Sequence, residues 1–184
     1  MTDKNKIAFI NGKGGCGKTT SIFHIAGVLS KLKEPVLVID LDKQRNTTDS
    51  LLLNNNEDDR TYTMYNLLCG ECTPDQIVKK SYIVTRPNAK PEYCGIDVLP
   101  SDIRLKDEKD YQDADIKEIL DNFIGKNGYK WVLVDMPPSN ETINKICFQQ
   151  IVDFVVVPFT SDGYSVSGYG DLIESINEAR GKNP

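Results

Sequence analysis

Residues 7–20 read Ile7-Ala8-Phe9-Ile10-Asn11-Gly12-Lys13-Gly14-Gly15-Cys16-Gly17-Lys18-Thr19-Thr20, a short apolar run followed by a glycine-dense loop and the start of a helical pattern. Gly12, Gly17, Lys18 and Thr19 fall on the spacing G-x-x-x-x-G-K-[ST] of a phosphate-binding loop. Glycines let backbone N–H groups converge on phosphate oxygens, and the following helix directs the positive end of its dipole at the anion. The stretch therefore predicts a strand, a phosphate-binding loop and a helix.

The residue types within this loop predict its chemistry. We expect Lys18 to reach the β- and γ-phosphates of a nucleotide and the Thr19 hydroxyl to bind Mg²⁺. An ordinary glycine turn is the alternative, but the full motif between a strand and a helix argues against it. The residues assigned to nucleotide binding are Gly12, Lys13, Gly14, Gly15, Cys16, Gly17, Lys18, Thr19 and Thr20.

The composition is that of a soluble globular protein. The chain has 184 residues, enough for one domain with one core, of which 39% are hydrophobic and 27% charged. The net charge of −5 argues against a broadly basic surface for nucleic acid, and no apolar run approaches the ~20 residues of a membrane span. Residues 1–6 are polar and lack a signal-peptide core, so we expect a cytoplasmic protein with no membrane partner.

The cysteines predict a reducing environment. There are five, an odd number scattered through the chain, which does not indicate a disulfide framework. Cys69 and Cys72 form a lone C-x-x-C, which we interpret as two incidental loop cysteines because no second pair or histidine lies nearby. Cys16 is open to oxidation if it is exposed, although filling a permissive loop position is the simpler interpretation.

Two carboxylates follow the second predicted strand. Residues 36–39 are a continuous apolar run, typical of a strand that is buried on both faces. A strand, a helix and a strand at this spacing imply a right-handed βαβ unit and a parallel sheet. We expect a three-layer α/β/α P-loop fold with a mainly parallel sheet. Asp40 and Asp42 lie at the carboxyl end of the second strand, where ligands bind in such sheets. We therefore expect both carboxylates near the phosphates.

Another strand also ends in a carboxylate. Trp131-Val132-Leu133-Val134 is apolar and is followed by Asp135. A carboxylate there is expected to hold Mg²⁺, directly or through water, opposite the Thr19 hydroxyl. The further expected elements are two short helices within residues 62–80 separated at Gly70, a strand at 96–99, a helix from 116 that ends at Gly125, a helix at 143–151, a strand at 153–158, a helix at 163–180, and surface loops at 54–60 and 86–91.

Three motifs resemble one family. Lys13-Gly14-Gly15-Cys16-Gly17-Lys18-Thr19-Thr20, with its additional lysine, resembles the deviant Walker A box of the ParA/MinD P-loop ATPases of the SIMIBI class. The run from Asp40 to Thr48 is similar to that family's switch I, D-x-D-x-Q-x-N-x-T, and Asp135-Met136-Pro137-Pro138-Ser139 is similar to its Walker B and switch II. The resemblance covers about Lys6 to Pro184, with the motifs in the family's order.

The resemblance implies a role for each charged residue. Lys13 would reach across a nucleotide sandwich dimer to the phosphates of the partner subunit. Asp42 would position or activate the attacking water, and Asp40 would support the Mg²⁺ shell through water. On this basis the catalytic residues are Lys13, Lys18 and Asp42, and the metal-binding residues are Thr19, Asp40 and Asp135.

The motifs are closer to the plasmid and chromosome partition branch, ParA/Soj, than to MinD. The resemblance therefore implies an ATP hydrolase, a Mg-ATP-driven dimerisation switch that acts in partitioning with a partition-type adaptor protein. We expect residues 1–184 to form a single P-loop ATPase domain without the usual C-terminal part of the family. In relatives that part carries the purine-recognition segment and much of the surface for non-specific DNA, so DNA binding is only weakly implied. A fragment and a naturally short member both remain open.

Other functions remain open at this stage. One is a MinD-like positioning ATPase that acts on a membrane or a protein cargo, and another is a nucleotide-binding interaction module without turnover. A ligase of related fold that uses ATP to activate a carboxylate would need a substrate pocket. The nitrogenase iron-protein relatives bind a cluster through cysteines, and Cys94 and Cys147 do not follow that pattern.

Overall fold

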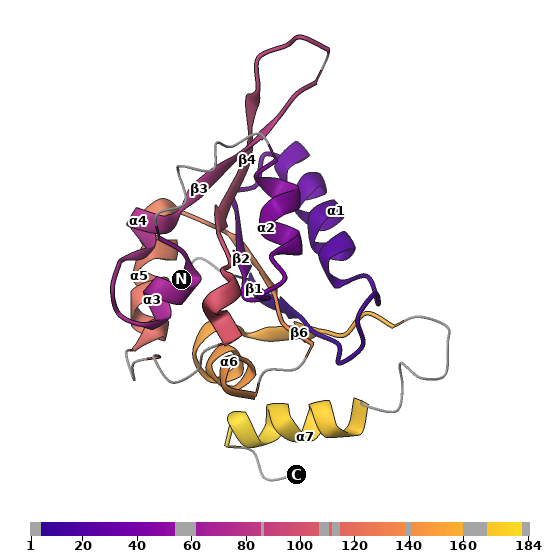
Figure 1. Ribbon diagram of the computed structural model, residues 1–184, viewed down its shortest axis with the longest axis vertical. Coiled ribbons are helices and arrows are strands. Elements are labelled where there is room, and N and C mark those ends of the chain that lie inside the picture. The colour runs from indigo at the N-terminus through magenta and orange to yellow at the C-terminus, as the bar shows by residue number, and fades with distance from the viewer. Residues whose placement is uncertain are drawn as a thin grey trace.

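The structure, a computed structural model, describes residues 5–53, 62–85, 87–106, 111, 115–138, 141–159 and 169–181. These residues form a six-stranded sheet in the order β3-β4-β2-β5-β1-β6 (Figure 1). Neighbouring strands in it are parallel, apart from the antiparallel pair β3 and β4. The strands are β1 (Asn5–Phe9), β2 (Val36–Asp40), β3 (Lys79–Ile83), β4 (Glu92–Leu99), β5 (Trp131–Asp135) and β6 (Phe154–Val156). The predicted mainly parallel sheet is confirmed.

Helices cover both faces of the sheet and complete the three predicted layers (Figure 1). On one face, α1 (Lys18–Lys31) and α2 (Asn46–Leu51) enclose one hydrophobic cluster. The larger cluster lies on the opposite face. The helices over it are α3 (Met64–Leu68), α4 (Pro74–Ile77), α5 (Ile116–Asn127) and α6 (Glu141–Ile146), followed by the π-helical turn Cys147–Ile151. The last helix, α7 (Tyr169–Ala179), packs against α6 and that turn.

The central strands explain why the apolar runs are continuous. In β2, Val36 and Val38 face one cluster, while Leu37 and Ile39 face the other. All five residues of β2 are buried. A strand that is covered on both faces has no solvent side for polar residues, so the usual alternation disappears. The same burial brings Asp40, the last residue of β2, into the interior.

The strand β3 was not predicted. Residues 62–80 were expected to hold only short helices, and α3 and α4 do form there, but the second helix ends at Ile77 and Lys79 begins a strand. Lys79-Lys80-Ser81-Tyr82-Ile83 is an edge strand, in which Ser81 alone is buried. Its polar residues hide the strand period, and pairing with β4 decides its conformation. The same pairing makes β4 begin at Glu92 instead of Ile96.

Gly125 does not end α5, contrary to the prediction. The helix continues to Asn127, and Gly128 ends it with a left-handed φ of +72°. The Gly128 N–H donates to the Gly125 carbonyl, and Tyr129 donates to Ile124. Because a left-handed residue is the usual helix stop, the second of two closely spaced glycines serves as the cap.

Smaller differences concern element ends. The helix expected at 143–151 begins at Glu141 and finishes as the π-helical turn, and the strand expected at 153–158 shortens to β6. Residues 87–90 form the expected surface loop. The loop expected at 54–60, residue 86, residues 163–168 of the last expected helix and Ser139 lie outside the described residues.

Candidate functional site

The glycine loop joins β1 to α1 at the carboxyl edge of the sheet. Gly15 and Gly17 have left-handed φ values of +77° and +91°, which side chains with a Cβ rarely adopt. Gly17 precedes the first turn of α1, and no side chain caps that helix. An added Cβ at Gly14, Gly15 or Gly17 would meet no atom within 4 Å. The loop therefore presents helix N–H groups and open space to an incoming anion.

Asn11 anchors the loop to the segment that follows the neighbouring edge strand, β6. Its side-chain amide donates to the Pro158 carbonyl at 2.8 Å, and its Oδ1 accepts from the Lys13 N–H at 2.8 Å. Asn11 is buried. The sequence reasoning did not single out this residue, although an asparagine directly before a glycine turn is a known signal for such side-chain-to-backbone turns.

Asp135 faces the start of α1. Its Oδ2 accepts from the Thr19 hydroxyl at 2.8 Å and from the Thr47 hydroxyl at 2.5 Å. The side chain is 1% exposed, and its Oδ1 is buried without a hydrogen-bond partner in the described structure. Burial raises the pKa of Asp135, while the Thr47 and Thr19 hydroxyls and the Lys18 charge oppose that rise.

An orphaned carboxylate oxygen beside a hydroxyl fits a magnesium ion. Mg²⁺ prefers oxygen ligands and is bound by one or two carboxylates together with substrate phosphates and water. An unsatisfied buried acceptor is costly unless something completes it. Among the described residues, no group of three or more His, Cys, Asp and Glu side chains could hold a metal. A magnesium ion here would therefore depend on phosphate and water as well as on Thr19 and Asp135.

Asp40 lies beside Asp135, because the two residues pair in register at the ends of β2 and β5. Its Oδ1 accepts from the Asp42 N–H at 3.0 Å. Its Oδ2 accepts from the Thr48 N–H at 2.8 Å and from the Thr48 hydroxyl at 2.7 Å. Burial, followed by the charge of Asp135, raises the pKa of Asp40 to about 7. Both oxygens thus bind the loop that follows β2, and the role of Asp40 toward magnesium stays a prediction.

Asp42 lies in that loop and is nearly buried. Its Oδ1 accepts from the Gln44 N–H at 3.0 Å, and its carbonyl accepts from the Arg45 N–H at 2.8 Å and the Ser101 hydroxyl at 2.6 Å. The charge of Asp42 contributes to the raised pKa of Asp135, as Lys18 lowers it, so the three groups share one site. Lys13 is half-buried in the glycine loop.

Three hydroxyl residues at this site were missed as functional residues. Thr47 and Thr48 lie in the first turn of α2 and donate to Asp135 and Asp40, respectively. Ser101 follows β4 and donates to the Asp42 carbonyl. The position of Thr48 in the D-x-D-x-Q-x-N-x-T pattern was a signal for one of them. Nothing local to the sequence indicated that Ser101 meets a loop 59 residues away.

Two further sequence expectations concern the state of the cysteines and the absence of a membrane span. All five cysteines are free, and Cys16 is buried within the glycine loop. The raised pKa of Cys72, about 11, results from burial and from the nearby charge of Glu71. Searching the described residues for a helix long and apolar enough to cross a membrane finds none.

This arrangement is that of a P-loop α/β domain, in which the helix after the first strand presents its amino end to a ligand at the carboxyl edge of the sheet. A family model described as an AAA domain (AAA_31) matches residues 4–184. The chain belongs to that family.

Curated relatives confirm the resemblance to ParA-type proteins. A ParA family protein of Mycoplasma pneumoniae is 32% identical over 97% of this chain and 66% of its own length. The chromosome-partitioning ATPase Soj of Thermus thermophilus is 31% identical over 97% of this chain and 64% of its own length. The chain thus spans about two thirds of the length of the curated relatives it matches.

Solved structures share the fold. A cobyrinic acid a,c-diamide synthase from Mycobacterium smegmatis, with an ATP analogue and magnesium bound, has a TM-score of 0.76 at 22% identity, covering 96% of this chain and 69% of the other. A plasmid partition protein from Borrelia burgdorferi has a TM-score of 0.71 at 22% identity, covering 96% of this chain and 75% of the other. At this identity the likeness concerns the fold alone.

Proposed function

We propose that this chain binds Mg-ATP and hydrolyses it as a ParA-type partition ATPase. The observation that carries the proposal is the hydrogen bond between Thr19, in the helix turn that follows the glycine loop, and Asp135, whose second oxygen is buried and unsatisfied. The relatives named for partitioning support the biological assignment. The proposal also treats residues 1–184 as one P-loop domain, supported by the single continuous sheet.

The glycine loop would hold the triphosphate. The nucleotide-binding set from Gly12 to Thr20 supplies N–H groups from the loop and the first turn of α1, and Lys18 would contact the β- and γ-phosphates. Thr19 and Asp135 would hold Mg²⁺, with Asp40 in support. When bound, the metal would neutralise charge on the phosphate oxygens. Lys13 would act on the phosphates of the second subunit in an ATP-dependent homodimer.

Asp42 would orient the water for in-line attack on the γ-phosphate. Its backbone and Oδ1 are fixed by Gln44, Arg45 and Ser101, so its carboxylate has a defined direction. In phosphoryl transfer most of the rate gain comes from positioning and from charge stabilisation. The loop around Asp42 thus contributes by orienting the carboxylate.

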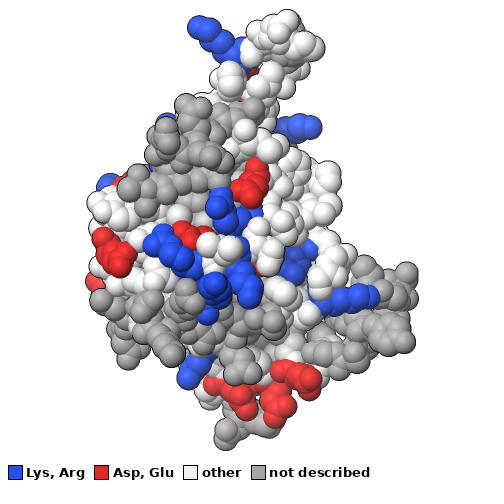
Figure 2. Space-filling view, in the orientation of Figure 1, with Lys and Arg blue, Asp and Glu red and all other residues white. Residues whose placement is uncertain are grey.

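The nucleotide state would set dimerisation and, through it, affinity for partners. The proposed partners are a partition-type adaptor protein and, more weakly, non-specific DNA, with action in the cytoplasm, where free cysteines persist. The α7 helix contains Asp171, Glu174 and Glu178 without a lysine or arginine. Figure 2 shows acidic side chains along the edge where α7 lies in Figure 1, and basic ones nearer the middle of that face. The acidic edge is a poor surface for DNA.

ATP turnover by purified protein tests the proposal. We expect Mg²⁺-dependent phosphate release that falls by at least about tenfold in Lys13→Ala and in Asp42→Ala. Lys31→Ala and Asp75→Ala are matched controls, because both residues are exposed and belong to other parts of the structure. Unchanged turnover in both site variants would reject the assignment, and binding without any turnover would favour an interaction module.

A further inference from the structure

Ser101 lies next to the proposed catalytic loop. It follows β4, which pairs with β2, the strand that leads into that loop. Its hydroxyl donates to the Asp42 carbonyl at 2.6 Å, and its N–H donates to the Thr48 hydroxyl at 2.9 Å. Ser101 is 1% exposed. A single buried residue thus binds the loop at Asp42 and again at the helix that closes it.

The Asp40 carboxylate links the two ends of the loop from Asp40 to Thr48 by hydrogen bonds. That carboxylate accepts from Asp42 at one oxygen and from Thr48 at the other. Ser101 adds the connection to the neighbouring strand. The Asp42 side chain leaves the backbone between an N–H that donates to Asp40 and a carbonyl that accepts from the Ser101 hydroxyl and the Arg45 N–H, so its direction depends on these contacts.

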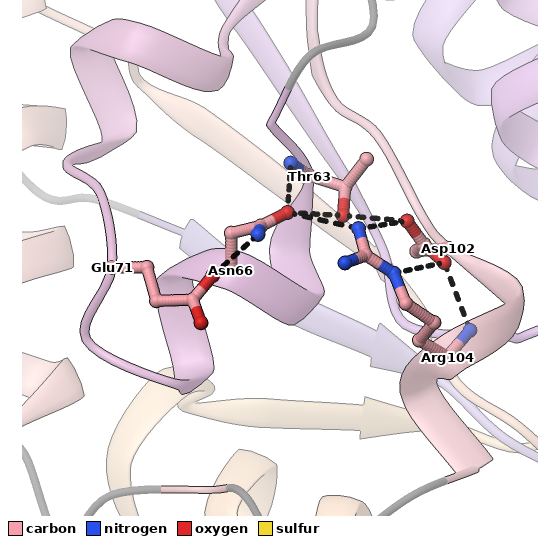
Figure 3. A network of polar contacts seen from close by, with 5 residues as sticks. All are labelled: Thr63, Asn66, Glu71, Asp102 and Arg104. Carbon is pink, nitrogen blue, oxygen red and sulfur yellow. Dashed lines mark hydrogen bonds and ion pairs between the residues drawn. The ribbon is translucent and has the colours of Figure 1, made fainter.

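The segment around Ser101 is itself firmly held. The Pro100 carbonyl accepts from the Met64 N–H at 2.9 Å, which ties it to α3. Figure 3 shows the contacts around the next residue, Asp102, whose carboxylate accepts from Arg104 at 2.7 Å and from the Thr63 hydroxyl at 3.2 Å. The Arg104 guanidinium lies 4.4 Å from the centre of the Tyr65 ring. Because the residues before and after Ser101 are both held by hydrogen bonds, Ser101 has a fixed position from which it can hold the Asp42 loop.

The ion pair between Asp102 and Arg104 strengthens the contacts that follow Ser101. Burial favours the protonated form of Asp102, but the hydrogen bonds and charge of Arg104 outweigh it and lower its pKa. Asn66 accepts from Thr63 and Arg104 and donates to Glu71 at 2.6 Å (Figure 3). The network joins α3 to the 3₁₀ turn Ile103–Lys106, directly after Ser101.

We propose that Ser101 is a positioning residue for ATP hydrolysis, which acts by holding the Asp42 carbonyl. The inference rests on the proposed ATPase function. Ser101 does not touch the nucleotide in this proposal. Its hydroxyl fixes the backbone from which the Asp42 carboxylate is directed, and removing it leaves ATP binding intact while water is oriented less well.

The first test is the separation of kcat from KM. In Ser101→Ala we expect kcat to fall about tenfold, since small misplacements of a reacting group have effects of that size or larger, with KM for ATP within about twofold. Ser101→Cys keeps the shape of the side chain with a slightly larger atom that donates only weakly, and we expect the same loss. Wild-type kcat in Ser101→Cys would overturn the inference.

Ser81→Ala is the matched control. Ser81 is also buried, and its hydroxyl also donates to a backbone carbonyl at 2.6 Å, that of Leu51, but it lies on β3 and does not contact the Asp42 loop. The unfolding midpoint of each variant is measured as well, so that a loss of kcat can be compared between variants of similar stability. We expect wild-type kcat in Ser81→Ala. Equal losses of kcat in Ser81→Ala and Ser101→Ala would show a general packing effect and overturn the inference.

A double-mutant cycle tests the route through Asp42. If Ser101 acts only by directing Asp42, Ser101→Ala should change kcat by less than about twofold in an Asp42→Ala background. An undiminished tenfold effect there would overturn the inference and leave the ATPase assignment standing. A wild-type protein that binds ATP but never hydrolyses it would overturn both.

Discussion

At the scale of single residues, the site is defined by two buried carboxylates side by side. Asp40 and Asp135 are both almost completely buried and end adjacent strands. Two like charges in a nonpolar interior are unfavourable for folding, and their raised pKa values reflect burial first. Such an arrangement is typical of functional sites, where a bound cation completes what the fold leaves unsatisfied.

Asp40 predicts a pH dependence of stability in protein free of nucleotide and magnesium. A carboxyl group whose pKa is higher in the folded state contributes stability that is complete below its unfolded pKa of 3.8 and is lost as the pH rises through about 7. We expect the free energy of unfolding to fall by about 2 kcal/mol between pH 5 and pH 7.5. Urea titrations across that range measure it.

Two other carboxylates with shifted pKa values do not affect the change between pH 5 and pH 7.5. These are Asp102, which forms an ion pair with Arg104, and Asp121, which forms one with Lys6. Their lowered pKa values contribute stability above the unfolded value of 3.8, which is lost only as the pH falls below it. Asp40→Asn removes this titrating group and should make the pH profile shallower, leaving only the contribution of Asp135, whose pKa burial also raises. An equally steep profile in that variant would show that another group is responsible.

Asp135→Asn should uncouple nucleotide binding from magnesium. The variant keeps the size of the side chain but loses the charge that Mg²⁺ requires from its carboxylate. We expect wild-type protein to bind ATP more tightly with Mg²⁺ than with EDTA, and this gain to shrink by at least about tenfold in the variant. Titrations of a fluorescent ATP analogue under both conditions measure the gain. If Mg²⁺ tightens ATP binding as much in the variant as in the wild-type protein, Asp135 does not bind the metal.

At the scale of secondary-structure elements, two glycines of α5 give a matched prediction. Gly128→Ala forces a Cβ into a left-handed cap and should lower the free energy of unfolding by about 1 kcal/mol. Gly125→Ala lies at an exposed position inside the helix and should raise it by up to about 1 kcal/mol. Denaturant titrations of both variants provide the comparison. The opposite ranking would contradict the assignment of Gly128 as the helix stop.

The sequence predicted elements well where one local pattern was sufficient. Continuous apolar runs at Val36–Ile39 and Trp131–Val134 identified the central strands, because burial on both faces leaves no other pattern. The polar edge strand β3 was missed, since its polar residues hide the strand period and only the pairing with β4 decides its conformation. Gly125 was taken for the helix stop because spacing does not show which glycine adopts a left-handed φ.

The residues of the candidate site also fall into those that a local pattern indicates and those that only the assembled fold brings together. Thr19, Asp40, Asp42 and Asp135 could be named from the sequence because each lies in a recognisable motif or at a strand end, and their roles stay predictions. Thr47 and Ser101 could not be named in this way, because their contacts join segments far apart in the chain. Which hydroxyl meets which carboxylate or carbonyl depends on strand order, and strand order is a property of the assembled sheet.

At the scale of the whole molecule, the carboxyl ends of β2, β4 and β5 converge on one edge of the sheet. The site lies on that edge, so a second copy could close over it with Lys13 at the junction. We expect Mg-ATP to shift the protein from monomer to dimer, as measured by analytical ultracentrifugation. Asp42→Ala should retain the dimer, because it impairs hydrolysis only, and Lys13→Ala should weaken it. Identical sizes with and without nucleotide would contradict the sandwich arrangement.

The proposed function requires that one Mg-nucleotide binds to the glycine loop, Lys18 and the Thr19–Asp135 pair. Isothermal titration calorimetry of folded wild-type protein with Mg-ATP tests it most directly. We expect saturable heat with one nucleotide per chain, weakened by EDTA and lost in Lys18→Ala. A folded wild-type protein that releases or absorbs no heat at any Mg-ATP concentration would contradict the proposed function.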